Sequence, residues 1–247
     1  MKRNLSKDNI PENTSKNTHN VVFELLFEDK DTNIVMDIPS GAGAFTKRLL
    51  DANKEVHSAD IQNILQVDNP NFQVSDMNKT LPFEDGKFCA VVCIDGIEHI
   101  ERQYDFIREC HRVLRKGGKL ILSTPNISSI RSRWRWLTTG HHNKCKAPLN
   151  EVKPTPLHHI GMISFHEMRY LLHSNGFTIT SIRTNRIKLV SWLYALWMPL
   201  LYISTSLVYK KEEKDPDQRK RNKEIKKQMF SSPILFGETM IIKATKH

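Results

Sequence analysis

The sequence predicts an α/β fold built on a mostly parallel β-sheet. Short apolar runs, rich in β-branched residues, alternate with helical patterns, and each run ends in polar residues. A glycine-rich turn follows the first run directly. Parallel strands need helical crossovers, and their carboxyl ends meet at one edge of the sheet, so a binding site is expected along that edge.

The first predicted strand, residues 34–36, runs into the turn Asp37-Ile38-Pro39-Ser40-Gly41-Ala42-Gly43, and a helical pattern follows. Gly41 and Gly43 lack the side chains that would keep backbone N–H groups away from a ligand, and glycine permits positive φ. A turn of small residues between a buried strand and a helix is therefore a candidate ligand cradle.

Four further strands are expected at residues 55–59, 72–75, 88–94 and 119–123. The first of these ends in Asp60. An acidic residue about 20 residues past a glycine-rich turn lies at the tip of the second strand, where it can accept hydrogen bonds from ribose hydroxyls.

In this order, the motifs resemble those of the class I S-adenosylmethionine-dependent methyltransferases. The motifs span about residues 34–126. In chain order they are Val35-Met36-Asp37 together with Gly41 and Gly43; Asp60; Asp76 together with Leu81-Pro82-Phe83; residues 91–100; and residues 113–126. A looser match over residues 164–177 resembles the last helix and sixth strand of that family. The resemblance implies a Rossmann-like, seven-stranded, mostly parallel sheet with helices on both faces, and S-adenosylmethionine as the cofactor.

Carried over position by position, the resemblance implies a cofactor site at the ends of the first four strands. Asp60 would hold the ribose, and Asp76 would accept from the adenine amino group. The family usually has glycine where this chain has Pro39, which has no N–H to donate, so a site that binds nothing is the alternative. The implied cofactor residues are Asp37, Pro39, Gly41, Gly43, Asp60, Ile61, Asp76, Met77, Ile94 and Asp95.

Methyl transfer from a sulfonium depends mainly on positioning, but a hydroxyl acceptor gains from a general base. His99 is the first candidate base, because Glu98-His99 follows the fourth strand and resembles the Glu-His pair of the family. His158 and His159 are the second candidates. The alternative is that Glu98 and His99 only order their loop. The chain lacks the cysteine and histidine spacing of zinc sites, so no metal is expected.

The 247 residues, 39% of them hydrophobic, are enough for one α/β domain with extensions. Residues 1–17 are polar and are expected to form a disordered tail, and residues 18–247 the methyltransferase domain. The four cysteines show no disulfide spacing and no apolar leader begins the chain, which indicates a cytoplasmic protein.

An apolar and basic insertion, residues 185–237, is expected before the last strand at residues 238–244. Within it, residues 189–209 carry no charged side chain and are just long enough to cross a ~30 Å hydrocarbon core. Pro199 interrupts the segment, and a single crossing would separate strands that must pair. A helical hairpin or broken helix in the membrane interface is therefore expected, with an apolar cap over the active site as the alternative.

The net charge of +10 comes mostly from two segments. Residues 126–160 have six basic side chains against one acidic, and residues 210–228 have nine against five. This concentration favours an anionic partner. The expected function is S-adenosylmethionine-dependent methyl transfer to a hydroxyl or carboxyl of a small-molecule, glycan or lipid-linked acceptor, by a cytoplasmic protein peripheral on the inner face of the membrane.

Two alternatives stay open. Trp134 and Trp136 alternate with arginines in a pattern that can stack nucleic-acid bases, which favours an RNA methyltransferase. Nucleic acid is the less favoured partner, because no appended RNA-binding module is present. The other alternative is a non-catalytic protein of the same fold that anchors a partner at the membrane.

Overall fold

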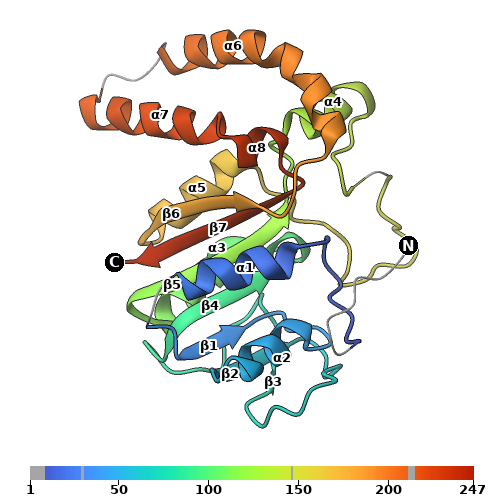
Figure 1. The fold of residues 1–247 in the computed structure, drawn as a ribbon, viewed down its shortest axis with the longest axis vertical. Coiled ribbons are helices and arrows are strands. Elements are labelled where there is room, and N and C mark those ends of the chain that lie inside the picture. Colours follow the sequence, from blue (N-terminus) through green and yellow to red (C-terminus); the bar gives the residue numbers. More distant parts are fainter. Residues whose placement is uncertain (1–8, 29–30, 146, 211–214) are drawn as a thin grey trace.

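Seven strands form one sheet in the order β3-β2-β1-β4-β5-β7-β6 (Figure 1). This computed structural model describes residues 9–28, 31–145, 147–210 and 215–247. Strand β7 is antiparallel to both of its neighbours, and every other neighbouring pair of strands is parallel. The predicted seven-stranded, mostly parallel sheet is confirmed. The strands are β1 Ile34–Asp37, β2 Glu55–Asp60, β3 Gln73–Val74, β4 Phe88–Ile94, β5 Leu114–Pro125, β6 Phe177–Thr184 and β7 Thr239–Lys246.

Helices cover both faces of the sheet, as expected. On one face α1 (Thr18–Phe27) and α2 (Ala44–Asp51) pack in the core cluster that contains Ala90 and Val92 of β4. On the other face α3 (Gln103–Val113) and α5 (Phe165–Ser174) pack in the cluster that contains Val91 and Cys93. Because successive residues of a strand point to opposite faces, a strand that is apolar throughout contributes side chains to the core on both faces of the sheet.

The fifth strand is longer than predicted, because the two glycines expected to precede it lie inside it. Gly117 has φ +74°, and the pairing of β4 with β5 shifts register between Phe88 and Ala90. This irregularity takes up the extra residues, as β-bulges do.

The N-terminal segment departs from the expectation of a tail disordered over residues 1–17. Residues 9–17 are described and contact the loops at the carboxyl edge of the sheet: the Thr14 hydroxyl donates to Asp95, and the Asn17 amide donates to the Asn185 carbonyl at 2.9 Å. Composition alone missed these contacts, because each is made with a residue distant in sequence. Residues 1–8 lie outside the described residues.

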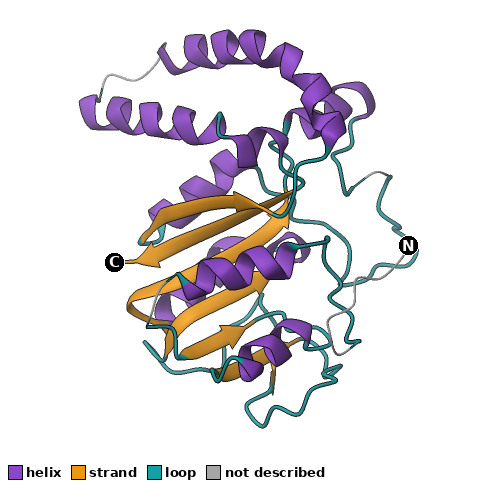
Figure 2. Ribbon diagram, viewed as in Figure 1, coloured by secondary structure: helices purple, strands orange, loops and turns teal. Residues whose placement is uncertain are grey.

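The predicted insertion between β6 and β7 is helical. It contains η2 (Leu189–Trp197), α6 (Met198–Lys210), α7 (Pro216–Met229) and α8 (Ser232–Phe236). Figure 1 shows η2 and α6 as one arm and α7 as a second arm that returns alongside it. Lys226 of α7 donates to Ser206 of α6 at 2.6 Å, so the two arms form a hairpin. Figure 2 shows that loops gather at the carboxyl ends of the parallel strands, and a binding site can form among these loops.

Candidate active site

Two cavities open at the carboxyl edge of the sheet. The first, of about 770 Å³, lies over the ends of β1, β2 and β4, and we call it the β1 cavity. The second, of about 930 Å³, lies between the end of β5, the N-terminal segment and the start of the insertion, and we call it the β5 cavity. Asp95 and His99 line both cavities. Two molecules bound in these cavities would therefore meet at Asp95 and His99.

The glycine-rich turn after β1 leaves open space at Gly41. This residue has φ +53°, no atom lies within 4 Å of where a Cβ would be, and its N–H donates to the Asp60 carboxylate at 2.8 Å. Gly43, predicted to admit a cofactor, does not line the β1 cavity. A Cβ at Gly43 would lie 2.8 Å from the Leu65 side chain, so this glycine serves packing at the start of α2.

Pro39, the departure from the family pattern, is accommodated by a second glycine. A Cβ on Gly96 would lie 2.3 Å from Cδ and 2.9 Å from Cγ of Pro39. The proline ring therefore occupies space that a side chain at position 96 would need. The absence of a side chain at Gly96 lets Pro39 line the β1 cavity.

Apart from Gly43, the residues predicted to bind the cofactor all line the β1 cavity. Sequence reasoning missed Ser40 and Ser75, which line this cavity and whose buried hydroxyls have no hydrogen-bond partner among the described residues. Small polar residues in loops give no signal in a single sequence. The predicted residues that line the cavity are Asp37, Pro39, Gly41, Asp60, Ile61, Asp76, Met77, Ile94 and Asp95.

Asp37 is almost fully buried at the end of β1, where its carboxylate accepts a hydrogen bond from the Thr46 hydroxyl at 2.7 Å. Burial raises its pKa to about 7, although the hydrogen bond from Thr46 opposes the shift. This bond ties the end of β1 to α2, so Asp37 fixes the shape of the turn as well as lining the cavity.

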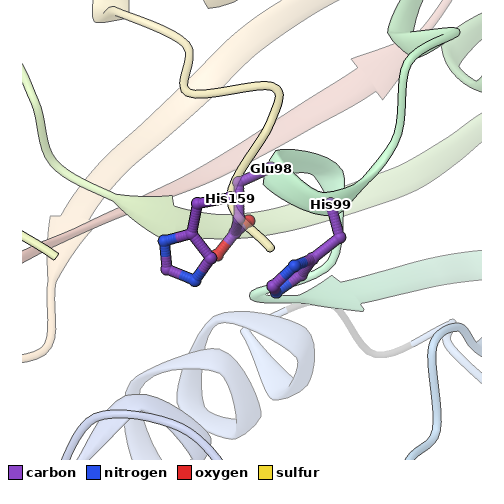
Figure 3. Close-up of side chains that lie close together, drawn as sticks. All are labelled: Glu98, His99 and His159. Carbon is purple, nitrogen blue, oxygen red and sulfur yellow. The ribbon is translucent and has the colours of Figure 1, made fainter. Parts of the chain in front are cut away.

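Three titratable side chains meet where the two cavities join. Glu98 and His99 belong to η1 (Ile97–His99), directly after β4, and His159 comes from the loop before α5 (Figure 3). The rings of His99 and His159 lie edge to face with centroids 4.7 Å apart. The sequence-predicted pair and one of the two second candidates therefore form one cluster, and His158 lines the β1 cavity beside it.

The His99 ring is held in a defined orientation. Its Nδ1 lies 3.1 Å from the carbonyl oxygen of His158, which can accept only if Nδ1 carries the proton. In the neutral ring Nε2 is then left as an acceptor. Burial lowers the pKa of His99, against the opposing effects of the His158 carbonyl and Asp95, so the neutral form is favoured at pH 7.

Glu98 is completely buried, and among the described residues its carboxylate accepts no hydrogen bond of normal geometry, although the Thr124 hydroxyl lies close enough to lower its pKa. Burial, reinforced by the charge of Asp95, raises its pKa well above the ordinary value. Burial and the neighbouring His99 lower the pKa of His159. Burial therefore favours the neutral form of all three side chains.

The cluster also has the ligand types of a metal site. Glu98 offers one carboxylate oxygen, and His99 and His159 each offer one ring nitrogen. These three possible ligand atoms all lie within 4.8 Å of one another. The expectation that the chain uses no metal stays a prediction.

The β5 cavity is lined by five cationic side chains, Lys16, Arg131, Lys144, Arg186 and Lys188, against the three carboxyl groups of Asp95, Glu98 and Glu238. Glu238 accepts hydrogen bonds from Arg186 and Lys188, and Lys144 lies 3.6 Å away. Burial alone would raise the pKa of Glu238, but these cations lower it to about 2. Arg131 adds a further positive charge at the same wall. This cavity therefore favours an anionic ligand.

Comparison with known proteins agrees with this geometry. Residues 36–122 match the family model described as a methyltransferase domain, from within β1 to within β5 and with the whole glycine-rich turn included. The fold is shared with a SAM-dependent methyltransferase from Archaeoglobus fulgidus, at a TM-score of 0.57 and 17% identity over 92% of both chains. The chain contains a class I methyltransferase domain.

The curated relatives are similar to this chain over a shorter stretch. A ubiquinone biosynthesis O-methyltransferase from Xanthomonas oryzae is 29% identical over 105 residues, or 37% of this chain and 43% of that protein. The same-named enzyme of Pseudomonas aeruginosa is 27% identical over the same length. The chain thus spans less than half the length of these relatives.

The cofactor of this family is S-adenosylmethionine, and the residues of the β1 cavity fit it. The open space at Gly41 admits a ligand close to the backbone, and the unpartnered hydroxyls of Ser40 and Ser75 can bond polar groups. Asp60 would hold the ribose and Asp76 the adenine amino group, as the resemblance implies.

Proposed function

We propose that this methyltransferase transfers the methyl group of S-adenosylmethionine to a hydroxyl of an anionic small-molecule, glycan or lipid-linked acceptor bound in the β5 cavity. One observation carries the proposal: Asp95 and His99 line both cavities, so the reacting groups would meet beside a histidine with a free ring nitrogen. The curated relatives named O-methyltransferases support oxygen as the atom methylated.

When bound, S-adenosylmethionine supplies a methyl group on a positively charged sulfur, which leaves as a neutral thioether. The acceptor oxygen would bond to the methyl carbon as the sulfur–methyl bond broke, and the hydroxyl proton would pass to Nε2 of His99. The His158 carbonyl holds this ring by accepting from Nδ1 at 3.1 Å. Holding both reactants at near-attack distance supplies most of the rate enhancement.

Positive charge at the β5 cavity supports the anionic character of the acceptor. Arg186, Lys188 and Lys144 surround the single carboxylate of Glu238, which leaves a net positive wall. A phosphate or carboxylate on the acceptor would complete the charge balance. We extend the proposal to a cytoplasmic location, which the free, buried thiols of Cys89, Cys93 and Cys110 support.

A labelled-methyl transfer assay tests the proposal. The protein would be incubated with S-adenosylmethionine labelled in the methyl group and a panel of hydroxylated acceptors with and without phosphate or carboxylate groups. We expect labelled methyl ethers on anionic members of the panel, and a loss of labelling with His99→Gln. Label found only on nitrogen of added RNA would contradict the proposal.

A further inference from the structure

The apolar arm of the insertion, residues 189–209, is exposed in the folded chain. It is 21 residues long, and its most apolar 18-residue window has a mean hydropathy of 1.2 and is only 6% buried. By length and composition alone this helix could cross a membrane. Only Ser191 of the segment lines either cavity, so the arm is not the buried cap considered as an alternative.

One face of the arm packs on the protein and the opposite face does not. Tyr194, Met198 and Leu201 pack in a cluster with Phe236 of α8 and Ile130 of α4 (Ile130–Thr139). Residues spaced by three and four share a helix face, and a second series at that spacing points outward. This outer stripe consists of Leu193, Leu196, Leu200, Ile203 and Leu207, with exposed fractions from 55% to 87%.

The aromatic and basic residues around the stripe match the interface of an anionic bilayer. Trp192, Trp197 and Tyr202 are about half exposed on the same arm, and aromatic side chains of this kind favour the headgroup level. The other arm, α7, is strongly basic, with exposed Arg219, Lys220, Arg221, Lys223 and Lys227. Anionic lipid headgroups attract such side chains by about 1 kcal/mol each.

The strand pairing argues against a membrane crossing. β6 and β7, which flank the insertion, pair side by side in one sheet. The returning arm α7 buries only Ile225 and carries charges along its length, so it cannot cross a hydrocarbon core. The hairpin therefore suits a helix that lies in the interface.

A second copy of the chain is a poorer occupant of the outer stripe. Paired helices in water carry charged residues beside the apolar seam. Here residues 189–209 contain no charged side chain at all. A helix whose exposed surface carries no charged side chain is more suited to lipid than to a helix partner with charged edges.

We infer that the hairpin of η2, α6 and α7 docks on an anionic lipid bilayer, with the outer stripe in the acyl boundary and the basic arm at the headgroups. Lys188 and Ser191, at the base of the apolar arm, and Arg131 of α4 line the β5 cavity. Docking would bring the mouth of this cavity to the membrane, so the acceptor class is a hydroxyl-bearing lipid headgroup. This last step rests on the proposed function.

Vesicle sedimentation with the full chain tests the inference. We expect the protein to sediment with vesicles that contain phosphatidylglycerol and to bind phosphatidylcholine vesicles far more weakly. High salt should release part of the bound protein. The double variant Leu196→Ser with Leu200→Ser should lower partitioning into vesicles at least tenfold. The double variant Lys220→Glu with Lys223→Glu should lower it by about fivefold or more for each lysine replaced.

The matched control is Val74→Ser with Val152→Ser, which changes two exposed apolar residues away from the hairpin and should leave partitioning unchanged. Circular dichroism and S-adenosylhomocysteine affinity of each variant report whether it is folded. No binding to either vesicle would overturn the inference, as would a stable dimer by light scattering that Leu196→Ser dissolves. Binding that resists both salt and carbonate would overturn it in favour of a spanning helix.

The two proposals fail separately. Vesicle binding without any methyl transfer to lipid or soluble acceptors would contradict the proposed function and leave the docking surface supported. Methyl transfer to soluble acceptors without vesicle binding would contradict the docking surface alone.

Discussion

In the proposed mechanism, His99 is the base that takes the proton of the acceptor hydroxyl. Its Nδ1 is committed to the His158 carbonyl and its pKa is lowered by burial, so Nε2 is free to accept a proton at pH 7. His99→Ala should lower turnover by roughly 10²–10⁴ and leave cofactor affinity near that of the unchanged chain. Steady-state kinetics with calorimetry measure both, and equal turnover in the variant would contradict the role.

The pH profile tests the same role independently. A base with a lowered pKa loses its neutral form only when the pH falls below its ordinary value of 6.5. The ratio kcat/KM should therefore be level at neutral pH and fall below pH 6.5, with the inflection absent in His99→Gln. Turnover should also survive treatment with a chelator. Loss of turnover with EDTA, restored by added divalent cation, would instead make Glu98, His99 and His159 metal ligands.

Asp60 should contribute directly to cofactor affinity. Its carboxylate is buried, holds the Gly41 N–H and lines the β1 cavity. Asp60→Asn should weaken S-adenosylhomocysteine binding by about 1–3 kcal/mol, because a buried charged acceptor is lost. Asp105→Asn on the exposed side of α3 is the matched control and should bind like the unchanged chain. Affinity that does not differ between the two variants would show that Asp60 only shapes the turn.

Among the elements, the turn after β1 depends on the contact between Pro39 and Gly96. Gly96→Ala should lower the free energy of unfolding by about 1–3 kcal/mol and weaken cofactor binding, because the new Cβ would lie 2.3 Å from the proline ring. Adding Pro39→Ala to the same chain should recover part of the loss. A double-mutant cycle by chemical denaturation measures the coupling between positions 39 and 96. Stability changes that simply add in the double variant would contradict a contact between the two residues.

The elements were largely predictable from the sequence, because apolar runs and helical patterns are local signals. The bounds of β4 were predicted correctly as residues 88–94. Those of β5 were not, since glycines that usually end an element lie in its irregular start. The contact of Pro39 with Gly96 and the ordered segment 9–17 could not be predicted, because both join parts of the chain that are distant in sequence.

At the scale of the whole molecule, the buried His19 should couple folding to pH. Burial lowers its pKa to about 4. The unfolded chain therefore takes up this proton at a higher pH than the folded chain, and stability is lost as the pH falls from 6.5 towards 4. Between pH 7 and pH 5 this group should cost roughly 2 kcal/mol of unfolding free energy. Denaturation of His19→Gln at both values should show a correspondingly smaller difference, and an unchanged difference would contradict the assignment.

The arrangement of cavities in the whole molecule follows from the topology that the sequence predicted. Most of the predicted cofactor residues line the β1 cavity, because the carboxyl ends of parallel strands converge. The β5 cavity was not predictable as a cavity, since it is formed by the N-terminal segment, η1, the end of β5 and the insertion. Two of its cations, Arg131 and Lys144, belong to the basic segment 126–160, whereas Arg186 and Lys188 lie outside both basic segments of the sequence.

Titration calorimetry with S-adenosylhomocysteine is the most direct test that this chain is a working methyltransferase domain. We expect one site per chain with a dissociation constant on the order of 1–100 μM. The ligand should also raise the melting temperature by mass action, because it binds only the folded chain. Absence of heat and of any thermal shift at millimolar ligand would contradict the central claim.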